Sequence, residues 1–244
     1  MPSPLAIFSD IHSNLEALKA VLADVRAQGV TDCICLGDIV GYASGVRSSL
    51  RTVRELECPV LLGNHDEASC AEFPPEDFNE TARAGVALAA ARLTASDRLW
   101  LDSLSRTIIR EGVTFTHASL ADPRHWHYIL GADDAREHFQ EQTTRLSFCG
   151  HTHRPMVWWQ HGDDLLYQPG EDVVGLPPSG KVLINVGSVG QPRDGDWRAC
   201  YVIFCPEEET VEFRRVEYDI QRTKRKILRA GLPRFTAQRL SLGR

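Results

Sequence analysis

The amino-acid sequence predicts an α/β protein, with α+β character in its second half, in which two packed β-sheets carry helices on their outer faces. Runs with strand and helix character alternate as β-α-β-α-β through residue 66, an order that implies parallel strands joined by right-handed crossovers. Beyond residue 145, six short apolar runs are separated by Gly, Pro or Asp turns, as is typical of antiparallel strands. With 244 residues, 43% of them hydrophobic, the chain is long enough to bury a sizeable core.

The first part of the chain supplies the parallel unit. Its predicted strands are Leu5–Phe8, Asp32–Leu36 and Val60–Leu62. Apolar residues recur at helical spacing over Asn14–Gln28, and Ser48–Leu56 also has helical character. Polar residues follow the end of each predicted strand, so the strand exits are the first place to look for a functional site.

The middle of the chain changes from helices to a hairpin. Thr81–Leu93 and Asp97–Leu104 are predicted helices, and Ser96 is the expected cap of the second one. Arg106–Arg110 and Gly112–Thr116 are predicted to pair as a hairpin.

The last part of the chain is rich in strands. The expected elements are a helix over Asp133–Gln142, the strands Leu146–Cys149, Pro155–Gln160, Leu165–Tyr167, Val182–Asn185, Ala199–Cys205 and Thr210–Val216, and a final helix over Asp219–Arg229. No repeat, low-complexity segment or linker interrupts this order. Residues 1–244 are therefore predicted to form a single domain, with a basic tail from about residue 231 whose charges form a solvated face.

The composition excludes several classes of protein. The net charge of −6 and a pI near 5.8 argue against stable nucleic-acid binding. Seven cysteines without framework spacing argue against a disulfide scaffold and favour a reducing, cytoplasmic location. No apolar stretch approaches the roughly 18 residues that a membrane span requires, and Met1–Pro4 does not begin a signal peptide.

Five strand exits carry the side chains of a metal site. The seven candidate ligands are Asp10, His12, Asp38, Asn64, His117, His151 and His153. Carboxylate and imidazole groups together suit a borderline divalent ion such as Mn, Fe or Zn. Asp38 is the central candidate, because its two oxygens could hold one ion each. Seven ligands suffice for two ions about 3.5–4 Å apart, with positions left for water and substrate.

Each of these residues also has an ordinary structural interpretation. A single Asp or His after a strand is more often a cap, a turn residue or a surface group. Asp10-x-His12 and Gly37-Asp38-x-x-Gly41 are weak signals taken alone. The joint occurrence of all the motifs in this order, each at a strand exit, favours the metal site.

The same motifs resemble those of the calcineurin-like metallophosphoesterase superfamily. They are Asp10-x-His12, Gly37-Asp38-x-x-Gly41, Gly63-Asn64-His65-Asp66, His117 and Gly150-His151-x-His153. The later segment from Asn185 to Asp194 resembles the small bacterial and archaeal branch of predicted phosphodiesterases, which is related to diadenosine tetraphosphatases. Nearly the whole chain is covered by this resemblance.

The resemblance implies a four-layer α/β/β/α sandwich and a binuclear centre. One metal would take Asp10, His12, Asp38 and His153, and the other would take Asp38, Asn64, His117 and His151. His65 would be the catalytic acid, and Asp66 would orient it. The cofactors would be two divalent ions, with Mn as the first choice and Fe, Zn, Ni or Mg as alternatives.

The implied reaction is hydrolysis of a phosphodiester or nucleotide phosphoester bond in a small substrate. A hydroxide bridging the metals would attack phosphorus, and His65 would protonate the leaving oxygen. Two departures argue against the protein-phosphatase branch: Ile39–Tyr42 lacks its phosphate-clamping arginine, and Asp66 stands where that branch has Glu. A phosphomonoesterase or Ser/Thr protein phosphatase-like enzyme is the alternative. A noncatalytic metal-containing interaction scaffold is a second one, although the chain keeps every ligand.

Several features stay open at the level of sequence. The loop from Ala118 to Gly131, with Arg124, Trp126 and Tyr128, can stack on a nucleotide base or form a packed cover. Arg193 can contact phosphate or pair with a neighbouring Asp, either residue 194 or residue 196. Four histidines outside the motifs are expected on the surface or in loops: His125, His127, His138 and His161. The oligomeric state is not indicated.

Overall fold

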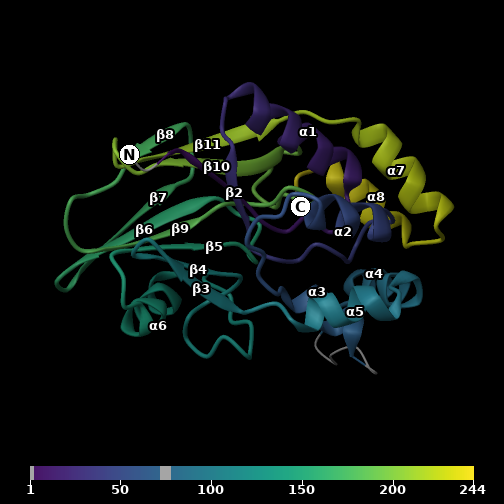
Figure 1. The fold of residues 1–244 in the computed structure, drawn as a ribbon, viewed down its shortest axis with the longest axis horizontal. Helices are drawn as coiled ribbons and strands as arrows, with labels where there is room; N and C mark the ends of the chain where they lie inside the picture. The colour runs from purple at the N-terminus through teal and green to yellow at the C-terminus, as the bar shows by residue number, and fades with distance from the viewer. Residues whose placement is uncertain (1–2, 72–77) are drawn as a thin grey trace.

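The computed structural model describes residues 3–71 and 78–244. Within these ranges the chain forms two mixed β-sheets and eight helices (Figure 1). The first sheet has the order β2-β1-β10-β11-β8 and the second the order β3-β4-β5-β9-β6-β7. Neighbouring strands in each sheet are therefore often far apart in sequence, which lets distant segments bring their ends to one place.

The first sheet is built around β1 (Leu5–Phe8). This strand pairs in parallel with β2 (Asp32–Cys35) and antiparallel with β10 (Ala199–Cys205). The sheet continues antiparallel through β11 (Thr210–Val216) to β8 (Val173–Gly175), a short strand that the sequence did not predict. The predicted parallel start and antiparallel continuation are both confirmed in this sheet.

The second sheet combines the predicted hairpin with later strands. Its members are β3 (Thr107–Arg110), β4 (Val113–Thr116), β5 (Leu146–Cys149), β6 (Met156–His161), β7 (Asp164–Pro169) and β9 (Lys181–Asn185). Strands β3 and β4 form the antiparallel hairpin, whereas β4, β5 and β9 run in parallel. The carboxyl ends of β4 and β5 therefore lie at the same edge of this sheet.

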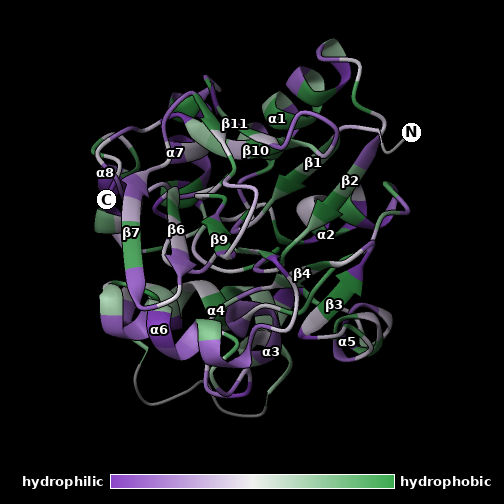
Figure 2. Cartoon of the chain, turned by 90° about the vertical axis from the view of Figure 1, so that its left-hand side faces the viewer, coloured by the Kyte–Doolittle hydropathy of each residue, from purple (hydrophilic) through white to green (hydrophobic). Residues whose placement is uncertain are grey.

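Alternation along the strands gives each sheet two apolar faces. Ile7 and Ile34 of the first sheet pack with Phe115, Phe148 and Ile184 of the second in one buried cluster. These side chains fill the space between the sheets, because successive residues of a strand point to opposite faces. Figure 2 shows hydrophobic residues gathered on the strands, with hydrophilic ones on the outer face of α6.

Helices cover the outer face of each sheet. The helices are α1 (Leu15–Ala27), α2 (Val46–Arg54), α3 (Asn64–Cys70), α4 (Glu80–Arg92), α5 (Ala95–Asp102), α6 (Ala132–Glu141), α7 (Ile220–Arg229) and α8 (Arg234–Leu240). Leu18 of α1 joins Phe8 and Tyr201 in the cluster outside the first sheet. Phe139 of α6 joins Trp158 and other residues outside the second sheet. The layers follow the order helix, sheet, sheet, helix, as the family resemblance implies (Figure 1).

Three local expectations are wrong. The segment Val60–Leu62 makes only isolated bridges, because Val60 pairs with Cys35 and Leu61 with Ser105, so no continuous ladder to one strand forms. Asn64, which was expected at the exit of this strand, is instead the first residue of α3. Thr94, rather than Ser96, caps α5 by accepting a hydrogen bond from the backbone of Asp97.

His138 was expected on the surface, but it is fully buried in α6. Its Nδ1 atom accepts a hydrogen bond from the backbone N–H of Leu120, and its Nε2 atom lies 3.0 Å from the Ser147 hydroxyl. His138 thus anchors the start of the loop 118–131. Helical periodicity can show which face of a helix is buried. It does not decide whether a His is buried, because His occurs both in protein interiors and on surfaces.

The basic tail contains a helix, and its charges at Arg234 and Arg244 are exposed as expected, whereas Arg239 is half-buried. Residues after 231 form α8, whose Ala237 and Leu240 pack with Ala43 and with Ile227 of α7. The C-terminal end is also tied to the loop before β10, because the backbone N–H of Gly195 donates to the carbonyl of residue 243. None of the helices in the described ranges has the length and apolar character needed to cross a membrane.

Candidate metal centre

All seven candidate ligands converge on one buried point. Asp10 and His12 follow β1, Asp38 follows β2, His117 follows β4, and the pair His151 and His153 follows β5. Ligand atoms fall into three overlapping groups, each within 4.8 Å: Asp10–His12–His153, Asp10–Asp38–His117, and His12–Asp38–His65, which includes the expected acid. Asn64 joins at the start of α3, with its Oδ1 atom 3.2 Å from His117 Nε2. The sheet ends therefore deliver these side chains, as the strand-exit pattern predicts.

Three histidines are held in one tautomer by the backbone. The Nδ1 atoms of His12, His117 and His153 lie 3.2, 2.9 and 2.6 Å from the carbonyl oxygens of Val40, Leu36 and Gln191. A carbonyl can only accept, so each Nδ1 carries the proton. Each Nε2 atom then presents its lone pair to the centre, which is the arrangement of a metal-ligating histidine.

The two carboxylates each turn one oxygen toward the centre. Asp10 Oδ2 accepts the backbone N–H of His151 at 2.9 Å, and Asp38 Oδ1 accepts the backbone N–H of His65 at 2.8 Å. The other oxygen of Asp10 is buried without a hydrogen-bond partner. Asp38 Oδ2 lies 3.6 Å from His12 Nε2 and 3.5 Å from His117 Nε2.

This geometry distinguishes the two Asp38 oxygens. We expected one oxygen for each ion, but Oδ1 is engaged by the backbone. Oδ2 alone faces both His12 and His117, which stand in different halves of the ligand set. A single oxygen of Asp38 is therefore the group placed between the two halves.

The donor set fits divalent cations. His12 Nε2 and His153 Nε2 are 3.0 Å apart, and His153 Nε2 is 3.2 Å from Asp10 Oδ1. With Nδ1 protonated, these atoms bring only lone pairs and negative charge, so they repel unless a cation lies among them. Ligands bound at about 2.1 Å to one ion stand roughly 3 Å apart. His151 Nε2 is also buried without a hydrogen-bond partner, as expected of an atom that binds a metal ion.

Backbone strain accompanies the ligands. Five of the seven have left-handed backbone conformations: Asp10, His12, Asp38, His151 and His153, with φ between 48° and 66°. Such conformations are uncommon for non-glycine residues and cluster at functional sites. They let a strand end abruptly and redirect its next side chains into the centre.

The electrostatics of the protein chain alone are unfavourable for these groups. Burial lowers the pKa of His12 and of His151, and it lowers the pKa of His153 to about 4. Burial, together with the nearby Asp10 and Asp66, raises the pKa of Asp38. For Asp10, burial acts in the same upward direction, but the surrounding imidazoles, His153 first, bring its pKa below the ordinary value. Neutral imidazoles beside carboxylates are ready to receive metal ions.

His65 lies beside the ligands but is held differently. Its ring packs between Tyr42 and Phe78, with centroids 4.7 and 4.9 Å away, and lies 4.8 Å from the ring of His12. Its Nδ1 atom is buried and has no hydrogen-bond partner. A Cβ atom at Gly41 would come within 2.5 Å of that nitrogen. Gly41 is therefore required for the ring to occupy this position.

Asp66 does not orient His65, contrary to expectation. Its carboxylate instead accepts the backbone N–H groups of Ile39, Val40 and Gly63 at 3.0–3.2 Å. Burial raises the pKa of Asp66 to about 7, against the opposing effect of these hydrogen bonds. Asp66 thus fastens the turn that carries Asp38. The contact could not be inferred from sequence, since adjacent residues at a helix start point in different directions.

The segment from Asn185 to Gln191 supports the ligand loops. Asn185 Nδ2 donates to the carbonyl of Gly150 at 2.5 Å, and Ser188 Oγ donates to the carbonyl of Asp10 at 2.9 Å. The carbonyl oxygen of Gln191 accepts the hydrogen bond from His153 Nδ1. This part of the sequence pattern is therefore explained by bracing of the ligands.

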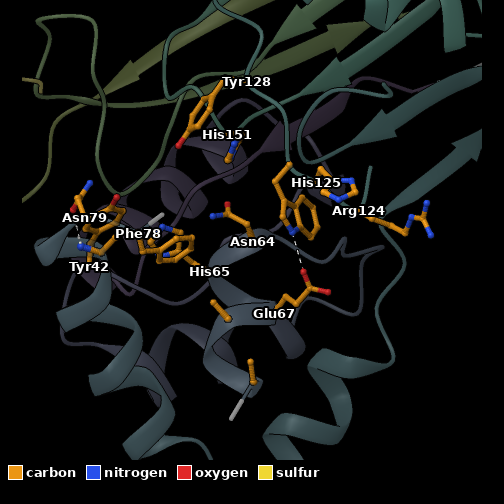
Figure 3. A pocket seen from close by; sticks show the side chains of 14 residues that line it. Tyr42, Asn64, His65, Glu67, Phe78, Asn79, Arg124, His125, Tyr128 and His151 are labelled. Carbon is orange, nitrogen blue, oxygen red and sulfur yellow. Dashed lines mark hydrogen bonds between the residues drawn. The ribbon is translucent and has the colours of Figure 1, made fainter. Parts of the chain in front are cut away.

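A pocket of about 620 Å³ opens beside Asn64, His65 and His151. Four aromatic side chains line its wall, Tyr42, Phe78, Trp126 and Tyr128, together with polar residues such as Asn79 and Arg124. Figure 3 shows Tyr128 and His151 on one side and Tyr42, Phe78 and His65 on the other. An apolar pocket with a few polar groups is the usual form of a small-molecule site.

The loop 118–131 forms a packed cover over the ligands. Tyr128 stacks on the ring of His151 with centroids 3.9 Å apart, and Trp126 meets His117 edge-on at 5.6 Å. The Trp126 indole N–H donates to Glu67 at 2.8 Å (Figure 3). Tyr128 nevertheless keeps 45% of its surface exposed, so one face remains available to a ligand.

The structure also decides the position of Arg193. Its two neighbouring carboxylates have other partners: Asp194 pairs with Arg215, and Asp196 pairs with Arg198. Arg193 Nη2 instead donates to the hydroxyl of Tyr42 at 3.2 Å. Sequence analysis missed Tyr42 as a site residue, although its place directly after Gly41 of the second motif was a usable signal.

The fold and this donor set define a metallophosphoesterase, and comparison with known proteins agrees. The sequence profile described as the calcineurin-like phosphoesterase superfamily domain matches residues 4–209. The chain belongs to this superfamily and is a phosphoester hydrolase.

Individual relatives cover the entire chain. An uncharacterized protein of Methanocaldococcus jannaschii is 38% identical over 249 residues, which is 99% of each protein. The crystal structure of a metallophosphoesterase from Sphaerobacter thermophilus has a TM-score of 0.88 and 38% identity over 99% of both chains. A hypothetical protein from Pyrococcus horikoshii shares the fold, with a TM-score of 0.81 and 16% identity over 99% of this chain and 98% of that one.

Proposed function

We propose that this protein is a binuclear-metal-dependent enzyme that hydrolyses phosphodiester or nucleotide phosphoester bonds in a small substrate. The observation that carries the proposal is the convergence of Asp10, His12, Asp38, His117 and His153, with Asn64 and His151 next to His117, beside a pocket with aromatic side chains. Asp10, His12 and His153 would hold one ion, and Asn64, His117 and His151 the other. Asp38 would serve both through Oδ2. Mn is our first choice of metal, and Fe, Zn, Ni and Mg are the alternatives.

Bound divalent ions would activate a water and withdraw charge from the phosphate oxygens. The chain itself supplies the positioning. The backbone carbonyls that fix Nδ1 of His12, His117 and His153 keep the ligand lone pairs aimed inward. The covering loop with Trp126 and Tyr128 limits the access of bulk water to one side of the centre.

His65 is the proposed acid for the leaving oxygen. Burial and the charge of Arg193 lower its pKa, so the free protein holds this ring neutral at pH 7. A phosphate anion bound beside it would raise that pKa, because an opposite charge favours the protonated ring. The ring is positioned by Tyr42 and Phe78 rather than by a carboxylate.

The preference between diester and monoester is a separate part of the proposal. The second motif lacks a clamping arginine, which favours the singly charged diester. However, Arg193 reaches the site from a distant part of the chain and could bind phosphate in place of the missing arginine. The absence of an arginine in the second motif is therefore weaker support for a diester. The aromatic pocket supports a substrate with a large organic group on phosphorus, such as a nucleoside.

An activity panel with Mn tests the proposal. Bis-p-nitrophenyl phosphate, p-nitrophenyl phosphate and a dinucleoside polyphosphate are compared at equal protein and metal concentration. We expect the diester to be hydrolysed at least as fast as the monoester. A strong monoester preference would make the protein a phosphomonoesterase or a protein phosphatase-like enzyme.

Metal analysis separates an enzyme from a noncatalytic scaffold. We expect two ions per chain after saturation with Mn and removal of free metal. Zero or one ion would contradict the binuclear centre. Two ions without hydrolysis of any ester in the panel would favour the interaction scaffold.

A further inference from the structure

The C-terminal helix α8 brings a second arginine to the site. Arg239 lies on its last turn, with the guanidinium carbon 5.7 Å from the ring centroid of Tyr42 and 5.6 Å from that of Phe235. Ala237 and Leu240 are buried against Ala43, which fixes the helix next to Tyr42. Arg239 lies beyond residue 209, where the superfamily match ends.

Arg193 and Arg239 share one aromatic neighbour. The Arg193 guanidinium carbon is also 5.7 Å from the Tyr42 ring centroid. Burial, and after it the charge of Arg193, lower the pKa of Arg239. Tyr42 in turn contacts the rings of His12 and His65, each with centroids 4.7 Å away. The two arginines therefore stand one aromatic ring away from the proposed metal centre.

Neither arginine is neutralised by a side-chain carboxylate in the described part of the chain. Arg193 donates to Tyr42 and to the side-chain oxygen of Gln191, and Arg239 Nε donates to a main-chain oxygen of Arg244, the last residue of the sequence, at 2.5 Å. The hydroxyl of Tyr128 lies within reach of Arg193 as well. The partners of Arg193 are neutral side chains, whereas Arg239 contacts a main-chain oxygen of Arg244.

One donor of this pair has no partner at all. The Nε atom of Arg193 is buried without a hydrogen bond to any described residue. Burying a charged donor without an acceptor costs more free energy than burying a neutral donor. In this structure the unpaired donor also lies near a second cation, Arg239. An anion with several oxygens would satisfy both guanidinium groups at once.

We propose that Arg193 and Arg239, together with the hydroxyls of Tyr42 and Tyr128, form an anion subsite for a second phosphate of the substrate, next to the ester that is hydrolysed. This inference rests on the proposed function and narrows its substrate class. The preferred substrate is then a phosphoester with a further phosphate group, as in a nucleoside polyphosphate. Arg239 would be a binding residue supplied by α8, a role outside the metal ligands.

Binding of inorganic pyrophosphate to the metal-free protein tests the subsite without catalysis. Chelator-treated and dialysed protein is titrated calorimetrically with pyrophosphate and, separately, with inorganic phosphate. We expect the wild type to bind pyrophosphate more tightly than phosphate. Arg239→Met, which keeps the stem against Tyr42 and Phe235, should weaken pyrophosphate binding about tenfold or more. Its effect on phosphate should be smaller.

Arg229→Met is the matched control, because Arg229 is an exposed arginine on the neighbouring basic helix α7 and is not a member of the pair. It should bind pyrophosphate as the wild type does. Arg239→Gln removes the charge but keeps a polar head, and it decides the question if Arg239→Met does not fold. Thermal unfolding of each variant checks that the helix still packs.

Equal pyrophosphate affinity in the wild type and in the folded Arg239 variants would overturn the proposal. So would an equal loss in Arg229→Met, which would indicate only general attraction by the basic helices. These outcomes are independent of the metal centre. Failure of the activity panel with intact pyrophosphate binding would instead overturn the proposed hydrolysis and leave the anion subsite standing.

Discussion

The floor and the outer wall of the site are built in different ways. The floor consists of the candidate ligands, most of them at strand exits, and three of its histidines are held by backbone carbonyls at 2.6–3.2 Å. The wall consists of Tyr42, Tyr128, Arg193 and Arg239, which come from loops and from a C-terminal helix and contact one another through side chains.

This difference separates chemistry from selectivity. A backbone hydrogen bond survives most side-chain changes, so the floor keeps its geometry while the surrounding sequence varies. A wall of side chains can be changed one residue at a time, which alters the substrate without altering the reaction. Substitutions in the floor should therefore have larger effects on the reaction than substitutions in the wall.

The largest effect is expected from Asp38→Asn. Asp38 Oδ2 faces both halves of the ligand set, so loss of its charge should weaken both ions. We expect metal content to fall at both sites and hydrolysis to drop by roughly 10⁴-fold or more, because bound metal supplies several kcal/mol of charge stabilisation. Elemental analysis and rates are measured on one preparation.

Asp163→Asn is the matched control, since Asp163 lies in the exposed turn between β6 and β7. It should retain both ions and full activity. Loss of only one ion in Asp38→Asn would assign Asp38 to a single metal and contradict its bridging position.

The next largest effect is expected from His65→Ala, at the border of floor and wall. A nitrophenolate departs without help, whereas a ribose or alkyl oxygen needs a proton. We expect both metals to stay, a modest loss on nitrophenyl esters, and a loss of about 10²–10⁴-fold on a nucleotide ester. Exposed His161→Ala is the control. A lost ion with equal losses on both substrates would make His65 a ligand.

A pH experiment tests the support of the wall. Burial lowers the pKa of His138 to about 3, so the folded state binds its proton less readily than the unfolded state does. The free energy of unfolding is therefore unaffected by His138 above the pKa of an unfolded histidine, about 6.5, and decreases as the pH falls from there toward 3. Between pH 6.5 and 5 this residue should remove about 2 kcal/mol from the free energy of unfolding.

Metal-free wild type and His138→Gln are compared by urea unfolding across this range. The variant should show a flatter acid dependence, because the other buried histidines titrate equally in both proteins. Parallel curves would mean that His138 is already protonated in the fold, and its hydrogen bond from Leu120 would then need another explanation.

The smallest effect is expected from Tyr128→Ala on the wall. If its exposed face stacks on a nucleotide base, the inhibition constant of adenosine monophosphate should rise about fivefold to tenfold. That of inorganic phosphate should change less. Tyr167→Ala, an exposed tyrosine on β7, is the control. Equal changes for both inhibitors would identify Tyr128 as a packed cover of His151 only.

Sequence by itself determined the floor. Ligand types, strand alternation and the β-α-β-α-β order were enough to predict two sheets whose ends collect Asp10, Asp38 and His117, because each strand exit is a local feature of the chain. The same local patterns predicted α1, α4, α7 and the hairpin of β3 and β4 close to their observed bounds.

Only the tertiary structure decided the wall and the supports. Asp66 binds the backbone of Ile39 and Val40 instead of His65, and His138 is buried although its type is ambiguous in sequence. Arg239 meets Tyr42 across almost two hundred residues of chain. Such contacts depend on how whole helices and strands pack against one another. Local sequence patterns do not show which distant residues this packing brings together.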